Sequence, residues 1–213
     1  VYSSDPWHDA ADATIQMLQV IAMDSGDTLV AGATYLTASP MVLAQAVELA
    51  PTSLPLDFTL GLTIRPIGIE GGWGNIIHVS ATGNNCCNYG DRIPAVWFYP
   101  GNLRLHIRDG TTSSGNAGCD PEEQLVVDQA TNVRIEIAAA QIEVFLDDVS
   151  KCSAARTDGR TTHQNARIFL SDDWSLAANA EVDNVYIQQG ALLSGCTDRG
   201  ACNYDFGAGL DDG

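Results

Sequence analysis

The chain is built largely from short segments in which apolar and polar residues alternate with a period of two. In LDFTLGLTIRP, every second residue from Phe58 to Ile64 is apolar, as expected where successive side chains point to opposite faces of a sheet. The pattern returns in NIIHVS, AVWFYP, LRLHIRDG, VRIEIAA, QIEVFLDD, ARIFLSDD and VDNVYIQ, with Gly, Asn, Asp or Pro between the segments. Many short alternating strands predict an all-β sandwich.

The segments that end at Ile137 and resume at Ile142 are predicted to form a hairpin, because the joint between them is short. One face then carries polar side chains and the other points inward. The polar set is Arg134, Glu136, Gln141 and Glu143, and the inward set is Val133, Ile135, Ile142 and Val144. Residues 9–23 and 40–51 also fit helical spacing. We predict strands there instead, the first over residues 13–22.

The first fifteen residues, VYSSDPWHDAADATI, resemble IFLSDDWSLAANAEV, and an offset of 167 residues separates Trp7 from Trp174. That offset is one domain length, so the first copy resembles the closing strand of a sandwich. An isolated closing strand must be covered, because it leaves backbone groups unpaired. It can fold back on its own domain, belong to an upstream repeat, or insert into a neighbouring copy. The residues expected at such an assembly contact are Tyr2, Trp7, Ala10, Ala11 and Ile15.

Charge and cysteine content restrict the partners and the compartment. The chain has 27 acidic and 10 basic residues, for a net charge of −17, which disfavours nucleic acid as a partner. No apolar run reaches the ~18 residues of a membrane span, so no membrane insertion is expected. The six cysteines include no CxxC pair, which favours disulfides in an extracellular, oxidising setting.

Vicinal disulfides are rare, so Cys86 and Cys87 are expected to bond to Cys119 and Cys152, in either order, rather than to each other. Cys196 and Cys202 are expected to close a third, short loop.

The strand pattern, together with GGWGN, YGDRIP and SDDWSLAANAEVDNVYI, resembles the concanavalin A-like lectin/glucanase superfamily, and its laminin G-like jelly rolls in particular. The resemblance implies a two-sheet antiparallel jelly-roll sandwich over residues 28–190. Residues 1–27 form an N-terminal extension in this division. Residues 191–213 resemble the GCTD…ACNY…DDG cysteine module of secreted surface proteins, which is expected to continue beyond this chain.

Glucanases of the superfamily carry an E-x-D-x-x-E strand motif. Here EVDNVY supplies Glu181 and Asp183 but has Tyr186 in place of the acid/base. Glycoside hydrolysis needs two carboxyl groups, so we do not expect an enzyme.

Binding is the expected chemistry of the loops. Candidate carbohydrate residues are Trp73, Tyr89, Asp91 and Tyr99, because aromatic faces stack on sugars and a carboxylate orients them. The structural alternative places Trp97 and Trp174 in the core and gives Asp91 or Arg92 a buried ion pair.

Calcium is the candidate cofactor, because five oxygen donors fall within fifteen residues of the C-terminal module. They are Asp198, Asn203, Asp205, Asp211 and Asp212. The alternative is a solvated acidic tail closed by Cys196 and Cys202.

Two functions follow from these features. The first is an extracellular structural protein that assembles head to tail with copies of itself into a filament, by strand donation from residues 1–27. The second is a calcium-assisted, glycan-binding lectin domain of a cell-surface adhesin.

Overall fold

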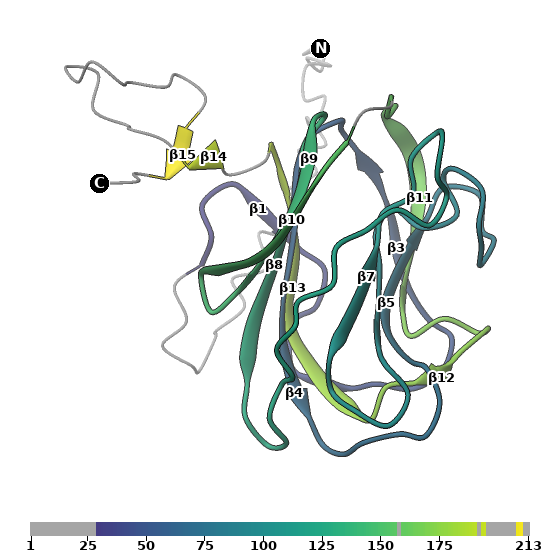
Figure 1. The fold of residues 1–213 in the computed structure, drawn as a ribbon, viewed down its shortest axis with the longest axis vertical. Helices are drawn as coiled ribbons and strands as arrows, with labels where there is room; N and C mark the ends of the chain where they lie inside the picture. Colours follow the sequence, from purple (N-terminus) through teal and green to yellow (C-terminus); the bar gives the residue numbers. More distant parts are fainter. Residues whose placement is uncertain (1–28, 157–158, 191–192, 195–207, 211–213) are drawn as a thin grey trace, which may run out of the picture.

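The computed structural model describes residues 29–156, 159–190, 193–194 and 208–210. This part of the chain is all-β, as predicted, and two antiparallel sheets pack as a sandwich (Figure 1). The strands of the first sheet are β1 (Ala33–Tyr35), β2 (Met41–Val42), β4 (Phe58–Pro66), β8 (Thr131–Ile137), β9 (Gln141–Leu146), β10 (Val149–Ala155) and β13 (Ala180–Gln189). Those of the second are β3 (Val47–Leu54), β5 (Gly74–Ser80), β6 (Ala95–Phe98), β7 (Leu105–Arg108), β11 (His163–Leu170) and β12 (Leu176–Ala177).

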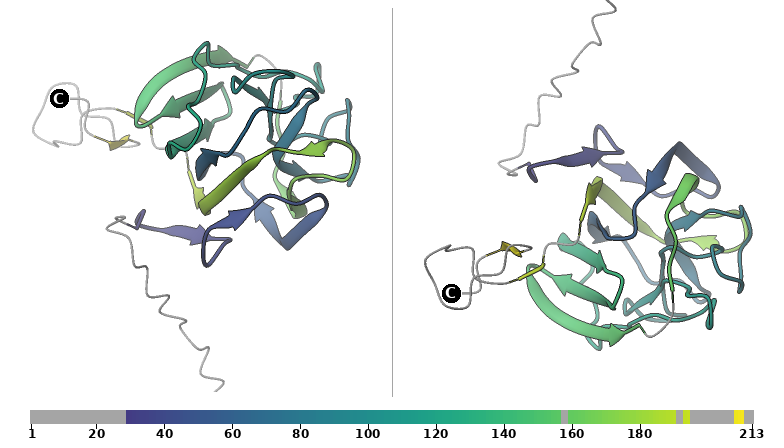
Figure 2. Two further views of the ribbon diagram at one scale, coloured as in Figure 1. Left: turned by 90° about the horizontal axis from the view of Figure 1, so that it is seen from below. Right: turned by 90° about the horizontal axis from the view of Figure 1, so that it is seen from above.

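The strand order places distant parts of the chain side by side. It is β1-β13-β4-β8-β9-β10 in the first sheet, where β2 also pairs with β13, and β3-β11-β5-β6-β7 in the second, where β12 joins β5 in parallel. Figure 2 shows β8, β9 and β10 on one side of the molecule and β3, β5 and β11 on the other. A separate parallel pair joins β14 (Leu193–Ser194) to β15 (Ala208–Leu210).

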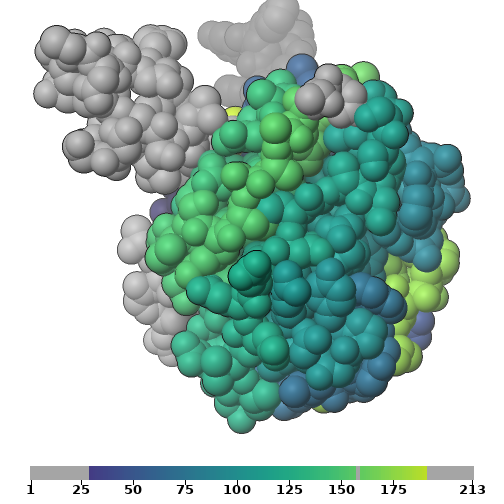
Figure 3. Space-filling view, in the orientation of Figure 1, coloured from purple at the N-terminus to yellow at the C-terminus, as the bar shows by residue number. Residues whose placement is uncertain are grey.

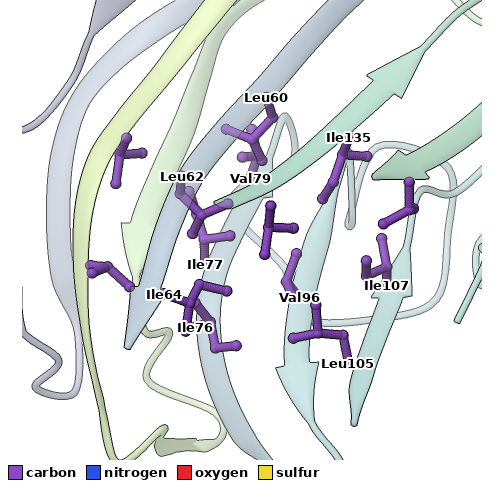
Figure 4. Packing of buried hydrophobic residues seen from close by; sticks show 14 of the residues in the cluster. Leu60, Leu62, Ile64, Ile76, Ile77, Val79, Val96, Leu105, Ile107 and Ile135 are labelled. Atoms are coloured by element: carbon purple, nitrogen blue, oxygen red, sulfur yellow. The ribbon is translucent and has the colours of Figure 1, made fainter. Parts of the chain in front are cut away.

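The core lies between the sheets and consists of the apolar positions of the alternating pattern. Figure 4 shows Leu60, Leu62 and Ile64 of β4 opposite side chains of β5, β6 and β7. The predicted hairpin is confirmed, since Ile135 pairs with Val144 and Ile137 with Ile142. Burial of this continuous apolar surface is the main favourable contribution to folding.

The polar face of the hairpin is also partly covered. Arg134 is only 8% exposed, because its guanidinium lies 3.9 Å from the centre of the Phe145 ring and pairs with Glu136. The segment 40–51 contains strand and no helix, also as predicted: β2 lies within it and β3 begins there. Tertiary pairing with β13 and β11 stabilises these strands, and such pairing commonly overrides local helical spacing.

The prediction that Cys86 and Cys87 bond to Cys119 and Cys152 was wrong for all four cysteines. Cys86 bonds to Cys87, and Cys119 bonds to Cys152 with their Cα atoms 6.0 Å apart. Cys119 is 7% exposed and packs in the core, where Cys152 of β10 reaches it. This leaves Cys86 and Cys87 with each other. In Figure 3 the green atoms of β9 and β10 lie directly against the teal atoms of the segment after β7 on the face in view.

Several predicted residues lie outside the described part of the chain. They are the assembly residues Tyr2, Trp7, Ala10, Ala11 and Ile15, the calcium candidates Asp198, Asn203, Asp205, Asp211 and Asp212, and the cysteines Cys196 and Cys202. The strand predicted for residues 13–22 lies outside it too. Within the described residues, no helix has the length and apolar character needed to cross a membrane.

Candidate functional site

The outer face of the second sheet carries a row of aromatic side chains that runs across its strands. Phe169 of β11 is opposite His78 of β5, and Trp97 of β6 is opposite His106 of β7. The rings of His78 and Trp97 lie 5.7 Å apart, and those of Trp97 and His106 lie 5.9 Å apart. Strand alternation explains the row, because the neighbours of these residues along each strand point into the core.

Two loop tryptophans rise above this row and enclose a hollow of about 480 Å³. We call it the aromatic groove. Trp73 precedes β5 and Trp174 precedes β12, and each is 41% exposed. The groove is lined by Gly72, Trp73, Asn85, Arg92, Trp97, His106, Trp174, Ser175 and Leu176. Single exposed apolar residues are common, but exposed apolar side chains gathered around one hollow mark a candidate binding site.

The loop that carries Trp174 is held by a buried carboxylate. Asp172 Oδ1 accepts hydrogen bonds from the backbone N–H groups of Trp174 and Ser175, at 3.1 and 2.8 Å. Its Oδ2 lies 2.8 Å from Nδ1 of His78, and both side chains are fully buried. Burial raises the pKa of Asp172. The hydrogen bond to His78, the charge of His78 and the hydrogen bonds from Ser175 lower it by more, so this pKa is below its usual value.

His78 also contacts a backbone carbonyl through its other ring nitrogen. Its Nε2 lies 2.7 Å from the carbonyl oxygen of Asp91, which can only accept, so Nε2 carries a hydrogen. This arrangement secures the Trp174 loop to β5 from below.

The Trp73 side of the groove rests on a partly buried carboxylate, that of Asp120. The Trp73 ring lies 4.9 Å from that of Tyr99 and 4.8 Å from that of His106. Asp120 holds both of these residues: the Tyr99 hydroxyl donates to it at 2.6 Å, and His106 Nδ1 lies 3.1 Å from it. Arg108 also pairs with Asp120 through two hydrogen bonds. The support under Trp73 is thus a charged network and is rigid.

This network shifts two pKa values. Burial raises the pKa of Asp120, but hydrogen bonds from His106, Arg108, Tyr99 and the Ile107 backbone outweigh it and hold this pKa well below its usual value. The hydrogen bond to Asp120 raises the pKa of the Tyr99 hydroxyl. The carboxylate therefore stays ionised and the phenol neutral at neutral pH.

Polar groups line the floor of the groove. The Trp97 indole N–H donates to the Ser175 hydroxyl at 3.1 Å. The guanidinium of Arg92 lies 4.7 Å from the centre of the Trp97 ring, and its Nε donates to the Asn85 carbonyl at 2.9 Å. An apolar hollow with a few directed polar groups is the usual form of a small-ligand or sugar site.

The predicted carbohydrate residues do not all meet here. Trp73 and Tyr99 lie together, but Tyr89 contacts Thr161 and the His163 ring instead. Asp91 is fully buried, so it cannot touch a ligand. Its carboxylate accepts from the Thr82 hydroxyl at 2.6 Å and the Asn88 backbone at 2.8 Å. The prediction that Asp91 orients a sugar was wrong, because the GDRIP loop uses this carboxylate to form its own turn.

The structural alternative was partly correct. Trp97 is 3% exposed, as expected of a packed residue, whereas Trp174 is 41% exposed and does not belong to the core. The buried ion pair expected for Asp91 or Arg92 is replaced by the hydroxyl, amide and carbonyl partners described above.

Sequence reasoning missed several groove residues, namely Asn85, His106, Trp174, Ser175 and Leu176. A signal was present for two of them. His106 lies between the core residues Leu105 and Ile107 in the alternating pattern, so it had to point outward. A tryptophan stands at this position in both copies of the repeat. Trp174 is exposed, so packing in the core does not explain why the residue is there.

The strand that carries the glucanase-like motif has a different use here. Glu181 forms an ion pair with Arg65, with its Oε1 atom 3.1 Å from Nη2 of the arginine. The Tyr186 ring packs directly over Gly61 of β4 and is 8% exposed. Burial raises the pKa of its hydroxyl. These residues lie on the first sheet, away from the aromatic groove on the second.

The described residues contain no group of three or more His, Cys, Asp or Glu placed to hold a metal ion. The five calcium candidates of the C-terminal module lie outside the described residues, so calcium binding there stays a prediction.

No protein-family model matches the sequence, and no curated protein matches it. Solved structures do share the fold. A heptameric SAP-like pentraxin from Limulus polyphemus has a TM-score of 0.54 at 10% identity, over 72% of this chain and 77% of that one. The binding domain of Paraclostridial Mosquitocidal Protein 1 has a TM-score of 0.52 at 14% identity, over 68% of this chain and 38% of that one.

A third similar structure is the ligand-binding domain of botulinum neurotoxin serotype D, determined in complex with N-acetylneuraminic acid. Its TM-score is 0.51 at 11% identity, over 76% of this chain and 39% of that one. The chain thus spans less than half the length of the two toxin chains. At these identities the likeness shows a shared β-sandwich fold and nothing about the ligand.

Proposed function

We propose that this domain binds carbohydrate in the aromatic groove. The observation that carries the proposal is the pair of exposed indoles, Trp73 and Trp174, on either side of a hollow of about 480 Å³. A sugar ring has an apolar face of C–H groups that stacks on an indole, while its hydroxyls need hydrogen-bond partners. Asn85, His106 and Ser175 line the floor where those hydroxyls would lie.

The support beneath the groove favours binding over a purely structural role. Asp172 accepts hydrogen bonds from the backbone of the segment that carries Trp174, and Asp120 fixes the rings of Tyr99 and His106, on which Trp73 packs. Pre-ordered side chains lose little entropy on binding. That one protein of the same fold was solved with a sugar bound agrees with the proposal but identifies no residue here.

Glycan-array screening of the full chain, followed by calorimetric titration of the best ligand, tests the proposal. Trp73→Ala and Trp174→Ala are each expected to weaken binding about tenfold, because each removes a stacking surface. The matched control is Val149→Ala. Val149 is 55% exposed but lies on β10 of the opposite sheet, so this variant should bind like the wild type. Binding that survives both tryptophan variants, or no binding across the array, would refute the proposal.

The extracellular setting, the calcium module and head-to-tail assembly are further proposals. The Cys119–Cys152 bond supports an oxidising compartment. Assembly is supported by the sequence repeat alone: Ser4, Asp5 and Trp7 match Ser171, Asp172 and Trp174. Light scattering of the full chain and of a chain that starts at residue 28 tests it, with and without a calcium chelator. A monomer in every condition contradicts the assembly.

A further inference from the structure

Arg92 is the one arginine among the groove-lining residues, and within the described residues it forms no direct ion pair, although the charges of the buried Asp172 and Asp91 act on it. It comes from the loop before β6 and lines the groove floor. Its three hydrogen bonds within the described residues all go to neutral oxygens: Nε to the Asn85 carbonyl at 2.9 Å, Nη1 to Asn116 Oδ1 at 2.6 Å and Nη2 to Asn85 Oδ1 at 3.3 Å. A guanidinium has five N–H donors in a planar fork, so two remain for a ligand.

Most arginines in the described residues are neutralised. Those that pair with a carboxylate are Arg65, Arg108, Arg134, Arg156, Arg160 and Arg167. Arg92 and Arg104 have no such pair there, and only Arg92 belongs to the groove lining. A partly buried cation has lost hydration, and a direct hydrogen bond to a ligand anion can compensate for that loss.

No acidic side chain lines the groove, although the chain has 27 acidic residues. The two carboxylates whose charges act on Arg92 lie beneath the surface and are already engaged. Asp172 is fully buried against His78, and Asp91 is fully buried against Thr82. A ligand in the groove therefore meets a guanidinium and two indoles, with no exposed carboxylate among the lining residues to repel an anion.

We propose that the glycan bound in the aromatic groove is acidic, with a carboxylate or sulfate group held by Arg92 while Trp73 and Trp174 stack on sugar faces. This inference rests on the proposed carbohydrate binding. The Arg fork matches the two oxygens of a carboxylate or sulfate, and such charge-assisted hydrogen bonds are about twice as strong as neutral ones. The net charge of −17 opposes the approach of a polyanion, but salt screens that repulsion beyond about 8 Å at physiological ionic strength.

The test compares acidic glycans with their neutral counterparts on the full chain. The array includes uronic-acid oligosaccharides with their methyl esters and sulfated oligosaccharides with their unsulfated parents, so that the two arms separate carboxylate from sulfate. The acidic member of the preferred pair is expected to bind about tenfold more tightly in low salt. This preference should shrink as salt is added, which can be measured without any variant.

Variants then assign the preference to one side chain. Arg92→Gln should remove it, and Arg92→Lys, which keeps the charge but loses the fork, should leave a smaller preference. Arg65→Gln is the control, because it removes one positive charge from β4 of the opposite sheet; its preference should equal that of the wild type. Circular dichroism and thermal unfolding verify that each variant is folded.

The outcomes separate the two proposals. If neutral glycans bind as tightly as acidic ones, or if Arg92→Gln keeps the acidic preference, this inference is overturned while carbohydrate binding stands. If no glycan of either kind binds, the proposed function itself fails.

Discussion

Asp172 shows how one buried carboxylate can position an exposed side chain, that of Trp174, by holding its backbone. Its carboxylate holds the backbone of Trp174 and Ser175 and faces the His78 ring. Because Asp172 is an identity of the sequence repeat, it also explains what the second copy preserves: a turn that presents a tryptophan. The small residues of the copy serve close approach, since Gly74 packs against Ala178 of the following turn.

We expect Asp172→Asn to destabilise the fold by about 3 kcal/mol at pH 7, because it leaves His78 without its anionic partner in a buried site. The pKa of Asp172 is lowered in the folded state. Its stabilising contribution is therefore complete above the unfolded value of about 3.9 and is lost as pH falls through the folded pKa. Urea unfolding at pH 7 and pH 3 should show the difference between the variant and the wild type shrinking in acid.

The control for this prediction is Asp173→Asn in the same loop. Asp173 is exposed, so its replacement should change the unfolding free energy by less than about 0.5 kcal/mol. Equal effects of the two variants, or a difference that does not depend on pH, would show that the His78–Asp172 pair does not hold the loop.

At the scale of single elements, the Tyr186 ring of β13 packs on Gly61 of β4. A Cβ atom on Gly61 would come within 2.1 to 2.4 Å of the Tyr186 ring, and Tyr186 pairs with Gly61 across the strands. The same Tyr186 occupies the place of the glucanase acid/base. Packing against β4, rather than chemistry, accounts for the residue at this position.

Gly61→Ala is accordingly expected to cost about 1–3 kcal/mol, because the buried ring must shift to admit the methyl group. Chemical denaturation measures it. Gly71→Ala serves as the control, since nothing lies within 4 Å of the added methyl group and the fold should be nearly unaffected. If the two alanines have the same effect, Tyr186 does not depend on the glycine for its place.

The elements were the most predictable part of this molecule. The hairpin of β8 and β9 follows from local alternation, and so do the inward residues of β4. The path of the chain between elements was not predictable in the same way. Whether Trp174 is buried depends on where the loop after β11 lies relative to His78, and the partner of Cys119 depends on how the two sheets meet. Both are contacts between residues far apart in sequence, which no local pattern encodes.

At the scale of the whole molecule, the two sheets are held together by their shared core and by one covalent link near their edges. Cys152 lies on β10, the edge strand of the first sheet, and Cys119 follows β7, the edge strand of the second. The bond spans a sequence separation of 33 residues. Removing such a loop constraint from the unfolded chain lowers stability by about 3–4 kcal/mol in the chain-entropy account.

The two disulfides of the described residues therefore make a matched pair for testing what closes the sandwich. Cys119→Ala with Cys152→Ala should lower the unfolding free energy by about 3–4 kcal/mol. Cys86→Ala with Cys87→Ala should lower the unfolding free energy by less than about 1 kcal/mol. A bond between adjacent cysteines closes almost no loop, so it restricts the unfolded chain very little. Urea unfolding of both double variants, with the wild type measured before and after reduction, decides the matter. Since reduction breaks both bonds, the unfolding free energy of the reduced wild type should be close to that of the Cys119/Cys152 variant. A larger loss of unfolding free energy in the Cys86/Cys87 variant would contradict this prediction. It would mean that the Cys86 loop, and not the link between the sheets, limits the stability of the sandwich.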